Sequence, residues 1–339
     1  MTITLPLAPG QGDAPSRPPV PAPVPAPARA PTPASVQAPA SVVMVRPHHF
    51  APDARLCRDN GFTTRAHGTA SEVARAAHAE VSAMAERLAG AGVRVHLFED
   101  ASSATPDSVF PNNWFSTHDC GSLVLYPMRA RTRRGERRRD VVDALAREYA
   151  VATVRDYSRA ERTGRYLEGT GSMVLDHVAR VAYVCRSRRV SAAVLRRFCA
   201  DHGYRAVVVD AVDRAGRPIY HTNVMMSVGT DLALVCLEAV RDASARRALR
   251  EELDGSGHEV VPLTLAQVGE FAGNALELTG STDRVLVMSA RGWASLDAAQ
   301  RRVVGAHVDV LPVHVPTVEH AGGSARCMVA GVHLPSRSR

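Results

Sequence analysis

The chain has 339 residues and a formal net charge of +7 at pH 7. Hydrophobic residues make up 45% of it and charged residues 22%, values that are ordinary for a globular protein and exclude a fibrous or low-complexity one. No apolar run approaches the roughly 18 residues that a membrane-spanning helix needs, so we expect no membrane partner.

Proline distinguishes the first 40 residues from the rest. Between Pro6 and Pro39 lie 12 of the chain's 22 prolines, interleaved with alanine. Such a stretch forms neither helix nor sheet ladder, so residues 1–40 are predicted to be an extended, disordered tail. The tail lacks the basic start and apolar core of a secretory signal, which indicates a cytoplasmic location.

The positive charge comes from arginine alone, because the chain contains no lysine, and seven arginines lie within Arg129–Arg139. The overlapping segment Glu136–Tyr149 is predicted to form an amphipathic helix, whose apolar side carries Val141, Val142, Leu145 and Ala146. We interpret the arginines as a solvated helix face. Aromatic residues that could stack on bases are missing around them, so we expect no nucleic-acid partner. A lid that brings arginines near an anionic substrate is the alternative.

Polar residues recur at a constant interval. Glu168, His221, Asn274 and Cys327 are each 53 residues apart, and Asn113 lies 55 before Glu168. Each precedes or opens a short apolar, strand-like run: 114–116 with 122–128, 172–176, 224–228, 275–278 and 328–334. A repeat of about 50 residues is typical of radial or stacked modules, whose equivalent strand ends meet near one point. The repeat therefore predicts that a thiol, an imidazole and a carboxylate converge.

The cysteine of this set has the context of a nucleophile. Cys327 follows two glycines, which allow backbone to approach a ligand, and an adjacent arginine, which favours the thiolate. A buried structural thiol is the alternative. The other five cysteines form no CxxC pair and are interpreted as core, loop or edge thiols: 57, 120, 185, 199 and 236.

His221 and Glu168 are selected because they are in phase with Cys327. A general base must lie within hydrogen-bond reach of its nucleophile, and a carboxylate can orient that base or hold the substrate. Their alternatives are a packing histidine and a turn carboxylate. The sequence contains no dinucleotide fingerprint, Walker loop, GxSxG elbow or metal-ligand spacing, since His48 and His49 are merely adjacent. We therefore expect chemistry without a cofactor or a metal.

Five segments together carry a resemblance to a known family: Phe110–Trp114, Leu167–Ser172, Tyr220–Val224, Phe271–Asn274 and Gly323–Met328. In this order and spacing they resemble the arginine-deiminase-related branch of the amidinotransferase (pentein) superfamily, specifically its citrulline hydrolase-like proteins. The resemblance covers roughly residues 41–335, leaving 336–339 as a C-terminal tail. It implies an α/β fold, a five-bladed propeller of ββαβ modules around a polar core.

By position, the resemblance implies that Cys327 is the nucleophile, His221 the acid/base group and Glu168 the carboxylate that faces the substrate's nitrogens. Asn113 and Asn223 replace aspartates that guanidine-using relatives place there. An amide can donate to a carbonyl oxygen, and its neutrality suits an uncharged group, so a ureido substrate such as citrulline is favoured over arginine.

The remaining expectations concern the rest of the substrate and the alternatives. Asn274 is expected to contact the substrate, and Arg188 to bind its carboxylate, with Arg46 and Arg165 as weaker candidates. Hydrolysis of citrulline through an S-linked intermediate would yield ornithine, ammonia and carbon dioxide. A guanidine hydrolase acting on arginine or methylated arginine, and a non-catalytic binding protein, are the alternatives. The expected partner is a small molecule, and assembly into a homo-oligomer stays open.

Overall fold

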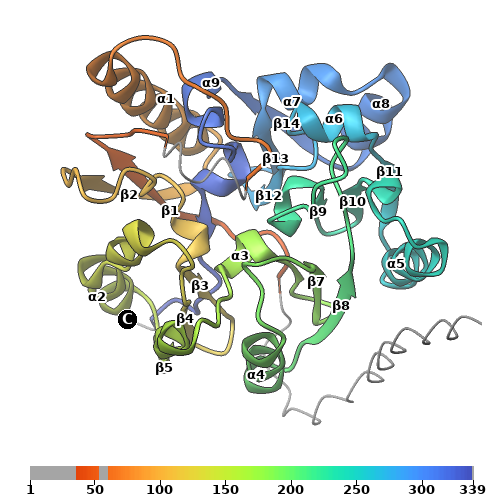
Figure 1. Cartoon of the computed structure of the whole chain (residues 1–339), viewed down its shortest axis with the longest axis horizontal. Helices are drawn as coiled ribbons and strands as arrows, with labels where there is room; N and C mark the ends of the chain where they lie inside the picture. Colours follow the sequence, from red (N-terminus) through yellow and green to blue (C-terminus); the bar gives the residue numbers. More distant parts are fainter. Residues whose placement is uncertain (1–35, 53–59, 338–339) are drawn as a thin grey trace, which may run out of the picture.

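The computed structural model describes residues 36–52 and 60–337. Within them the strands form five three-stranded sheets, which lie around a common centre with the longer helices outside (Figure 1). In every sheet the middle strand pairs antiparallel with one neighbour and parallel with the other. In four of the sheets a short connection joins the antiparallel pair, and in all five a helical crossover joins the parallel pair, so each sheet has the strand pairing of a ββαβ module.

Four modules follow one another along the chain. The second sheet holds β3 (Phe115–Thr117), β4 (Ser122–Leu125) and β5 (Thr153–Asp156), and the third holds β6 (Met173–Asp176), β7 (Val181–Cys185) and β8 (Arg205–Val209). The fourth holds β9 (Met226–Val228), β10 (Leu232–Val235) and β11 (Glu259–Pro262), and the fifth β12 (Leu276–Thr279), β13 (Arg284–Ser289) and β14 (Asp309–Val313). The strand-like runs of the sequence repeat supply the first strand of each.

The first sheet joins the two ends of the described chain. Its strands β1 (Ser41–Pro47) and β2 (Arg94–Asp100) are parallel, and β15 (Ala330–Gly331) pairs antiparallel with β1. The C-terminal segment that carries Cys327 therefore completes the module that the N-terminal segment begins. This pairing places Cys327 in the same structural position as the polar residues of the other four modules.

The crossover helices are α1 (Ala70–Gly90), α2 (Arg139–Glu148), α4 (Ala192–His202), α5 (Ala243–Gly255) and α8 (Ala298–His307). Shorter helices are α3 (Gly169–Ser172), α6 (Leu265–Gly269), α7 (Ala290–Ser295) and α9 (Pro316–Glu319). Helix α1 begins at a capping box between Thr69 and Glu72 and buries Val81 and Leu88 in the core. None of the helices in the described ranges combines the length and apolarity needed to cross a membrane.

The arginine-rich segment differs from its predicted form. Residues Arg131–Glu136 make a separate 3-10 helix, η3, and α2 begins only at Arg139. Because η3 turns inward, Glu136 is buried. Val141 and Leu145 lie on the buried face of α2, as the amphipathic pattern predicted.

The boundary of the predicted tail also differs. The Gln37 side chain is buried and its Nε2 donates to Leu175 O at 3.0 Å and to Val228 O at 2.9 Å, which links the third and fourth sheets. Ala38 O accepts from Thr279 Oγ1 at 2.8 Å. Residues 37–40 therefore belong to the folded domain, because their polar groups complete hydrogen bonds between sheets. The rest of the predicted tail, residues 1–35, lies outside the described residues.

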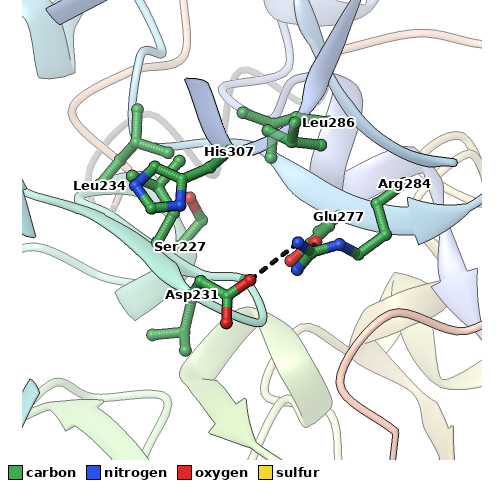
Figure 2. Close-up of a pocket in the computed structure, with 11 residues that line it drawn as sticks. Ser227, Asp231, Leu234, Glu277, Arg284, Leu286 and His307 are labelled. Carbon is green, nitrogen blue, oxygen red and sulfur yellow. Dashed lines mark ion pairs between the residues drawn. The ribbon is translucent and has the colours of Figure 1, made fainter. Parts of the chain in front are cut away.

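Ion pairs add to the contact between neighbouring sheets. Arg284 of the fifth sheet lies 2.8 Å from Asp231, the residue that precedes β10 of the fourth sheet (Figure 2). It also lies 2.9 Å from Glu277, on β12 of its own sheet. Glu277 is buried, so its charge needs this partner, and Thr230 N also donates to it. Leu234 and Leu286 lie beside the pair on the wall of a small inter-sheet pocket.

Candidate active site

The residues of the 53-residue repeat all lie at the turn that enters the first strand of a module. Asn113 ends the 3-10 helix η2 (Pro111–Asn113), Glu168 precedes α3, and His221 precedes η5 (Thr222–Val224). Asn274 follows the turn closed by its N–H donating to Phe271 O at 2.9 Å, and Cys327 lies in η7 (Ala325–Met328). Each of the five is at most 2% exposed. The repeat therefore brings these five side chains to one buried centre, as predicted.

Two amides contact the sulfur of Cys327. Asn223 Nδ2 lies 3.3 Å and Asn274 Nδ2 lies 3.2 Å from Cys327 Sγ. Asn274 is itself held, since its Nδ2 also donates to Asn223 O at 2.8 Å and its Oδ1 accepts from Arg326 N at 3.1 Å. Both amides therefore direct N–H donors at the sulfur that the sequence predicts to be the nucleophile.

A second chain of contacts joins His221, Glu168 and Arg189. His221 Nε2 lies 2.8 Å from Glu168 Oε2, and Arg189 Nη1 donates to the same oxygen at 2.8 Å. The other carboxylate oxygen accepts from Arg129 N at 3.0 Å. Glu168 is 0% exposed, and a buried charge requires such compensation, so Arg189 is the counter-ion that makes the ionised carboxylate tolerable.

These contacts fix the protonation states. Burial alone would raise the pKa of Glu168, but the charge of Arg189 and the hydrogen bond from His221 hold that pKa well below its usual range. Burial lowers the pKa of His221 to about 4, opposed by Glu168 and assisted by Arg189. At neutral pH the imidazole is therefore uncharged. Because a carboxylate only accepts, Nε2 carries the hydrogen and Nδ1 is the free proton acceptor.

A small cavity brings the two groups together. It is lined by Asn60, Asp107, Phe110, Asn113, Arg133, Arg189, Tyr220, His221, Ala321, Gly323 and Cys327. Nucleophile, base and one of the two aspartate-replacing asparagines thus share one space. In this arrangement the cysteine can attack a carbon and form a covalent intermediate, while the neutral imidazole, oriented by the carboxylate, accepts the thiol proton.

Gly171 lets the base approach this space. A Cβ atom on Gly171 would lie 2.2 Å from Asn113 Oδ1 and 2.9 Å from His221 Nδ1. Both distances are shorter than real Cβ contacts, so a larger residue would displace one side chain or the other. Close packing against Asn113 and His221 therefore requires glycine at position 171.

Arg133 and Asp107 were not identified from the sequence as site residues. Arg133 is buried, pairs with Glu136 through Nε at 2.8 Å and Nη2 at 2.7 Å, and also donates to Phe110 O. Burial opposes the charge on Arg133, but Glu136 raises its pKa further. One member of the arginine run thus faces the cavity, while neighbours such as Arg137 bind Glu161. A charged run that is typical of a surface helix does not indicate which of its arginines is buried.

The predicted carboxylate-binding arginine is placed differently from its neighbour. Arg188 is exposed and is not among the cavity-lining residues, whereas Arg189, one position later, is buried and binds Glu168. Of the weaker candidates, Arg165 is exposed and Arg46 pairs with Glu99 near the end of β1. Asn223 touches the sulfur and does not line the cavity wall.

One cluster of metal-ligating groups occurs in the described residues. Ligand atoms of His48, His78 and Glu99 lie within 4.8 Å of one another on the first module. Glu99 is already bound by Arg46 and by His48 at 2.8 Å. None of the three lines the cavity of Cys327, so this cluster takes no part in the chemistry described above.

Comparisons with known proteins identify the family and the fold. A model of the family described as N,N dimethylarginine dimethylhydrolase, eukaryotic, matches residues 46–334. No curated protein matches the sequence.

Several solved structures share the fold. The N-terminal domain of ArgZ, an arginine dihydrolase of the ornithine-ammonia cycle in cyanobacteria, has a TM-score of 0.68 at 17% identity, over 87% of this chain and 98% of that one. AgrE in complex with ornithine and NAD+ has a TM-score of 0.68 at 17% identity, over 88% of this chain and 40% of that one. The DDAH of Pseudomonas aeruginosa, complexed with citrulline, has a TM-score of 0.58 at 15% identity, over 86% and 99%. These likenesses confirm the predicted α/β fold of five ββαβ modules.

Proposed function

The chain belongs to the N,N dimethylarginine dimethylhydrolase family, within the arginine-deiminase-related part of the pentein superfamily that its motifs predicted, and from this premise we propose its reaction. The protein is a cysteine hydrolase that cleaves C–N bonds at the ureido or guanidino carbon of an arginine-related amino acid. Citrulline is the proposed substrate, and Cys327 forms the covalent intermediate.

One observation carries this proposal. Asn223 and Asn274 donate to Cys327 Sγ, and the cavity that this sulfur lines also contains His221, whose Nε2 is fixed by Glu168. The arrangement gives the sulfur two amide donors and places a neutral imidazole in the same cavity as a base. A non-catalytic binding protein has no need of a neutral buried base oriented in this way.

The first half of the reaction forms the S–C bond. Cys327 attacks the ureido carbon of citrulline, and its proton passes to His221 Nδ1, because the imidazole is uncharged before substrate arrives. The imidazolium then protonates the leaving nitrogen, the C–N bond breaks, and an S-linked carbamoyl group remains when ornithine leaves first. Glu168 stabilises the transient imidazolium through its contact with Nε2.

The second half releases the carbon. His221 Nδ1 takes a proton from water, which attacks the S-linked carbon, and the S–C bond breaks to return the Cys327 thiolate. The product is carbamic acid, which decomposes to ammonia and carbon dioxide. The two asparagines that donate to the sulfur favour this departure, since they stabilise the leaving thiolate.

The amide groups support a neutral substrate. Asn113 lines the cavity, and its Oδ1 packs against Gly171, so its amide nitrogen is available as a donor to a carbonyl oxygen. A carboxylate in its place would repel that oxygen. Citrulline offers one such oxygen.

Arginine as a first substrate is a second candidate, and Asp107 favours it. This buried carboxylate lines the cavity and supplies a negative charge that the two asparagines do not. A guanidinium could therefore find counter-charge in Asp107, and hydrolysis of arginine would yield citrulline in the same cavity. ArgZ, whose fold is similar, is an arginine dihydrolase.

The carboxylate end of the substrate needs a cation. We assign this part to Arg133, because its Nε and Nη2 bind Glu136 while Nη1 has no partner among the described residues, and because the residue lines the cavity. The exposed Arg188 is the alternative. Replacing the arginine that binds the carboxylate should raise KM, and replacing the other arginine should leave KM unchanged.

A substrate panel tests the proposal. Ammonia and amine release would be measured with citrulline, arginine, dimethylarginine and agmatine. Ornithine production from citrulline supports the ureido hydrolase, whereas production of ornithine from arginine with transient citrulline supports the second candidate. Release of methylamines from dimethylarginine, with no reaction of citrulline, would contradict both.

A further inference from the structure

A second internal cavity, of about 40 Å³, lies at the centre of the fold. The first strands of all five sheets, β3, β6, β9, β12 and β15, contribute to its wall. Its polar lining includes Gln37, Thr170, His177, Ser227, Arg326 and His333, and no aspartate or glutamate belongs to the wall. The cavity shares no lining residue with the cavity of Cys327. It is therefore a separate site with a positive polar surface.

Arg326 is the charged group of this cavity, and it has no carboxylate partner among the described residues. Its Nη1 donates to Val329 O at 3.1 Å, which uses one of the five N–H groups of the guanidinium. Burial lowers the pKa of Arg326 to about 10, whereas neighbouring carboxylates raise the pKa of other arginines such as Arg133. Because Arg326 is half-buried and no described carboxylate pairs with it, its remaining N–H groups can bind an anion.

Further polar groups face the same space without charge. His177 and His333 stack with ring centres 3.8 Å apart, and burial lowers the pKa of both, to about 4 for His333. Ser227 Oγ is buried and has no hydrogen-bond partner in the described part of the chain. A hydroxyl in this condition can donate to a ligand that the cavity holds.

We propose that this central cavity binds one small planar oxoanion, of the size of nitrate or bicarbonate, on the guanidinium of Arg326. The planar fork of a guanidinium matches the geometry of two oxygens on a trigonal centre. A volume of about 40 Å³ holds about three water-sized spheres, which suits an anion of four heavy atoms.

The position of Arg326 couples this anion to the nucleophile. Arg326 directly precedes Cys327, and the charge of one stabilises the charge of the other. An anion bound to the guanidinium offsets part of that attraction, so a filled cavity weakens the support that Arg326 gives to negative charge on the Cys327 sulfur. The bound anion should therefore lower the reactivity of Cys327 from outside the catalytic cavity.

Thermal unfolding of the full chain tests for the site. The melting temperature would be followed as nitrate or bicarbonate replaces gluconate at constant pH and ionic strength, because gluconate is too large for the cavity. We expect the temperature to rise with nitrate and bicarbonate, since a ligand of the folded state stabilises it. Arg326→Gln should weaken this binding at least about tenfold, and Arg247→Gln on the exposed face of α5 should retain it.

Ser227→Ala provides a second variant if Arg326→Gln does not fold. It removes one hydroxyl and keeps the cation, so we expect the apparent affinity to fall about fivefold. No anion-specific rise in the wild type, or an equal rise in Arg326→Gln, would overturn the proposal.

Alkylation of Cys327 tests the coupling without any turnover. Modification by iodoacetamide would be measured on the Cys327 peptide by mass spectrometry, with saturating nitrate or with gluconate. We expect nitrate to slow the wild-type reaction about fivefold and to leave Arg326→Gln unaffected. An equal slowing in both proteins would show that nitrate acts elsewhere and would refute the coupling. Neither measurement depends on the substrate assigned above.

Discussion

The amide nitrogen of Asn274 lies 3.2 Å from the sulfur of Cys327, and the two residues stand one repeat apart in the sequence. The same side chain binds Asn223 O and Arg326 N, so it connects the entry turns of three modules. The repeat thus explains both the convergence of these residues and the environment of the thiol.

Removal of either amide should make Cys327 a weaker nucleophile. A hydrogen bond to a charged group contributes about 1.5–3 kcal/mol, so Asn223→Ala or Asn274→Ala should slow alkylation of Cys327 roughly 10- to 100-fold. The measurement is the rate of alkylation at Cys327 across a range of pH. Asn274→Ala should also lower the melting temperature more than Asn223→Ala, because it loses two further contacts. Unchanged alkylation profiles in both would show that the amides do not act on the sulfur.

Placing a charge at Asn113 should reverse the substrate preference. Asn113→Asp removes a donor for the ureido oxygen, so kcat/KM for citrulline should fall roughly 10- to 100-fold, while the inhibition constant of arginine should improve. This single change is cleaner than one that includes Asn223→Asp, which would also put a carboxylate against the sulfur. If the ratio between the two ligands does not move, the neutral-substrate argument is wrong.

The acid limb of the pH profile should lie low and should depend on Arg189. His221 must be uncharged to act as a base, and its pKa of about 4 keeps it so through the weakly acidic range. Arg189→Met removes a charge that lowers this pKa, so the acid limb of kcat/KM should move toward neutral pH. Arg186→Met, which breaks only a surface pair with Asp210, is the control. An acid limb that stays in place in Arg189→Met would count against His221 as the base.

The same groups predict how stability depends on pH. The imidazole of His221 resists protonation in the folded state. The free energy of unfolding should therefore decrease as pH falls from the unfolded-state pKa near 6.5 toward the folded-state pKa of about 4. Glu168 has a lowered pKa, so its stabilising contribution is present above about pH 4 and is lost below it. Denaturant unfolding at several pH values should therefore show decreasing stability on acidification, and Glu168→Gln should remove part of this slope.

The space at Gly171 should be needed for catalysis. Gly171→Ala would force its Cβ against His221 or Asn113, and we expect kcat to fall at least about 100-fold, since small displacements of catalytic groups have effects of this size. Gly305→Ala in α8 is the matched control, because nothing lies within 4 Å of its Cβ position. A Gly171→Ala enzyme with normal kcat would show that the base can move without consequence.

Much of the site could be predicted because its residues share one phase. Glu168, His221, Asn274 and Cys327 occupy equivalent turns, and equivalent turns meet when ββαβ modules surround a centre. The repeat predicted radial or stacked modules, and the family resemblance implied that these are five ββαβ modules. No knowledge of side-chain conformations was needed for either.

The arginines and Asp107 could not be predicted in this way, because they are out of phase with the repeat. Arg133 lies in a charged run that is typical of solvent exposure, and only the inward turn of η3 buries it. Arg188 and Arg189 follow β7 in an irregular segment, where no alternation of buried and exposed residues says which one points inward. Gln37 was assigned to the tail because the composition of a segment indicates its overall character but does not locate the residue at which the segment ends.

Two truncations test the corrected boundary of the tail. Removal of residues 1–35 should leave the melting temperature nearly unchanged, as expected for a segment of this composition. Removal of residues 1–40 should lower it by several degrees, because Gln37 loses its buried hydrogen bonds to Leu175 and Val228. Equal melting temperatures of the two proteins would show that residues 36–40 contribute nothing.

Identification of the intermediate tests the role of Cys327 most directly. Wild-type enzyme would be mixed with citrulline, quenched in acid during turnover, digested and analysed by mass spectrometry. We predict a substrate-derived adduct on the peptide that contains Cys327, and none in Cys327→Ser, while Cys236→Ser keeps the adduct because burial raises the pKa of that thiol to about 12. Turnover of citrulline by Cys327→Ser at a near-normal rate, or an adduct on another residue, would contradict the proposed mechanism.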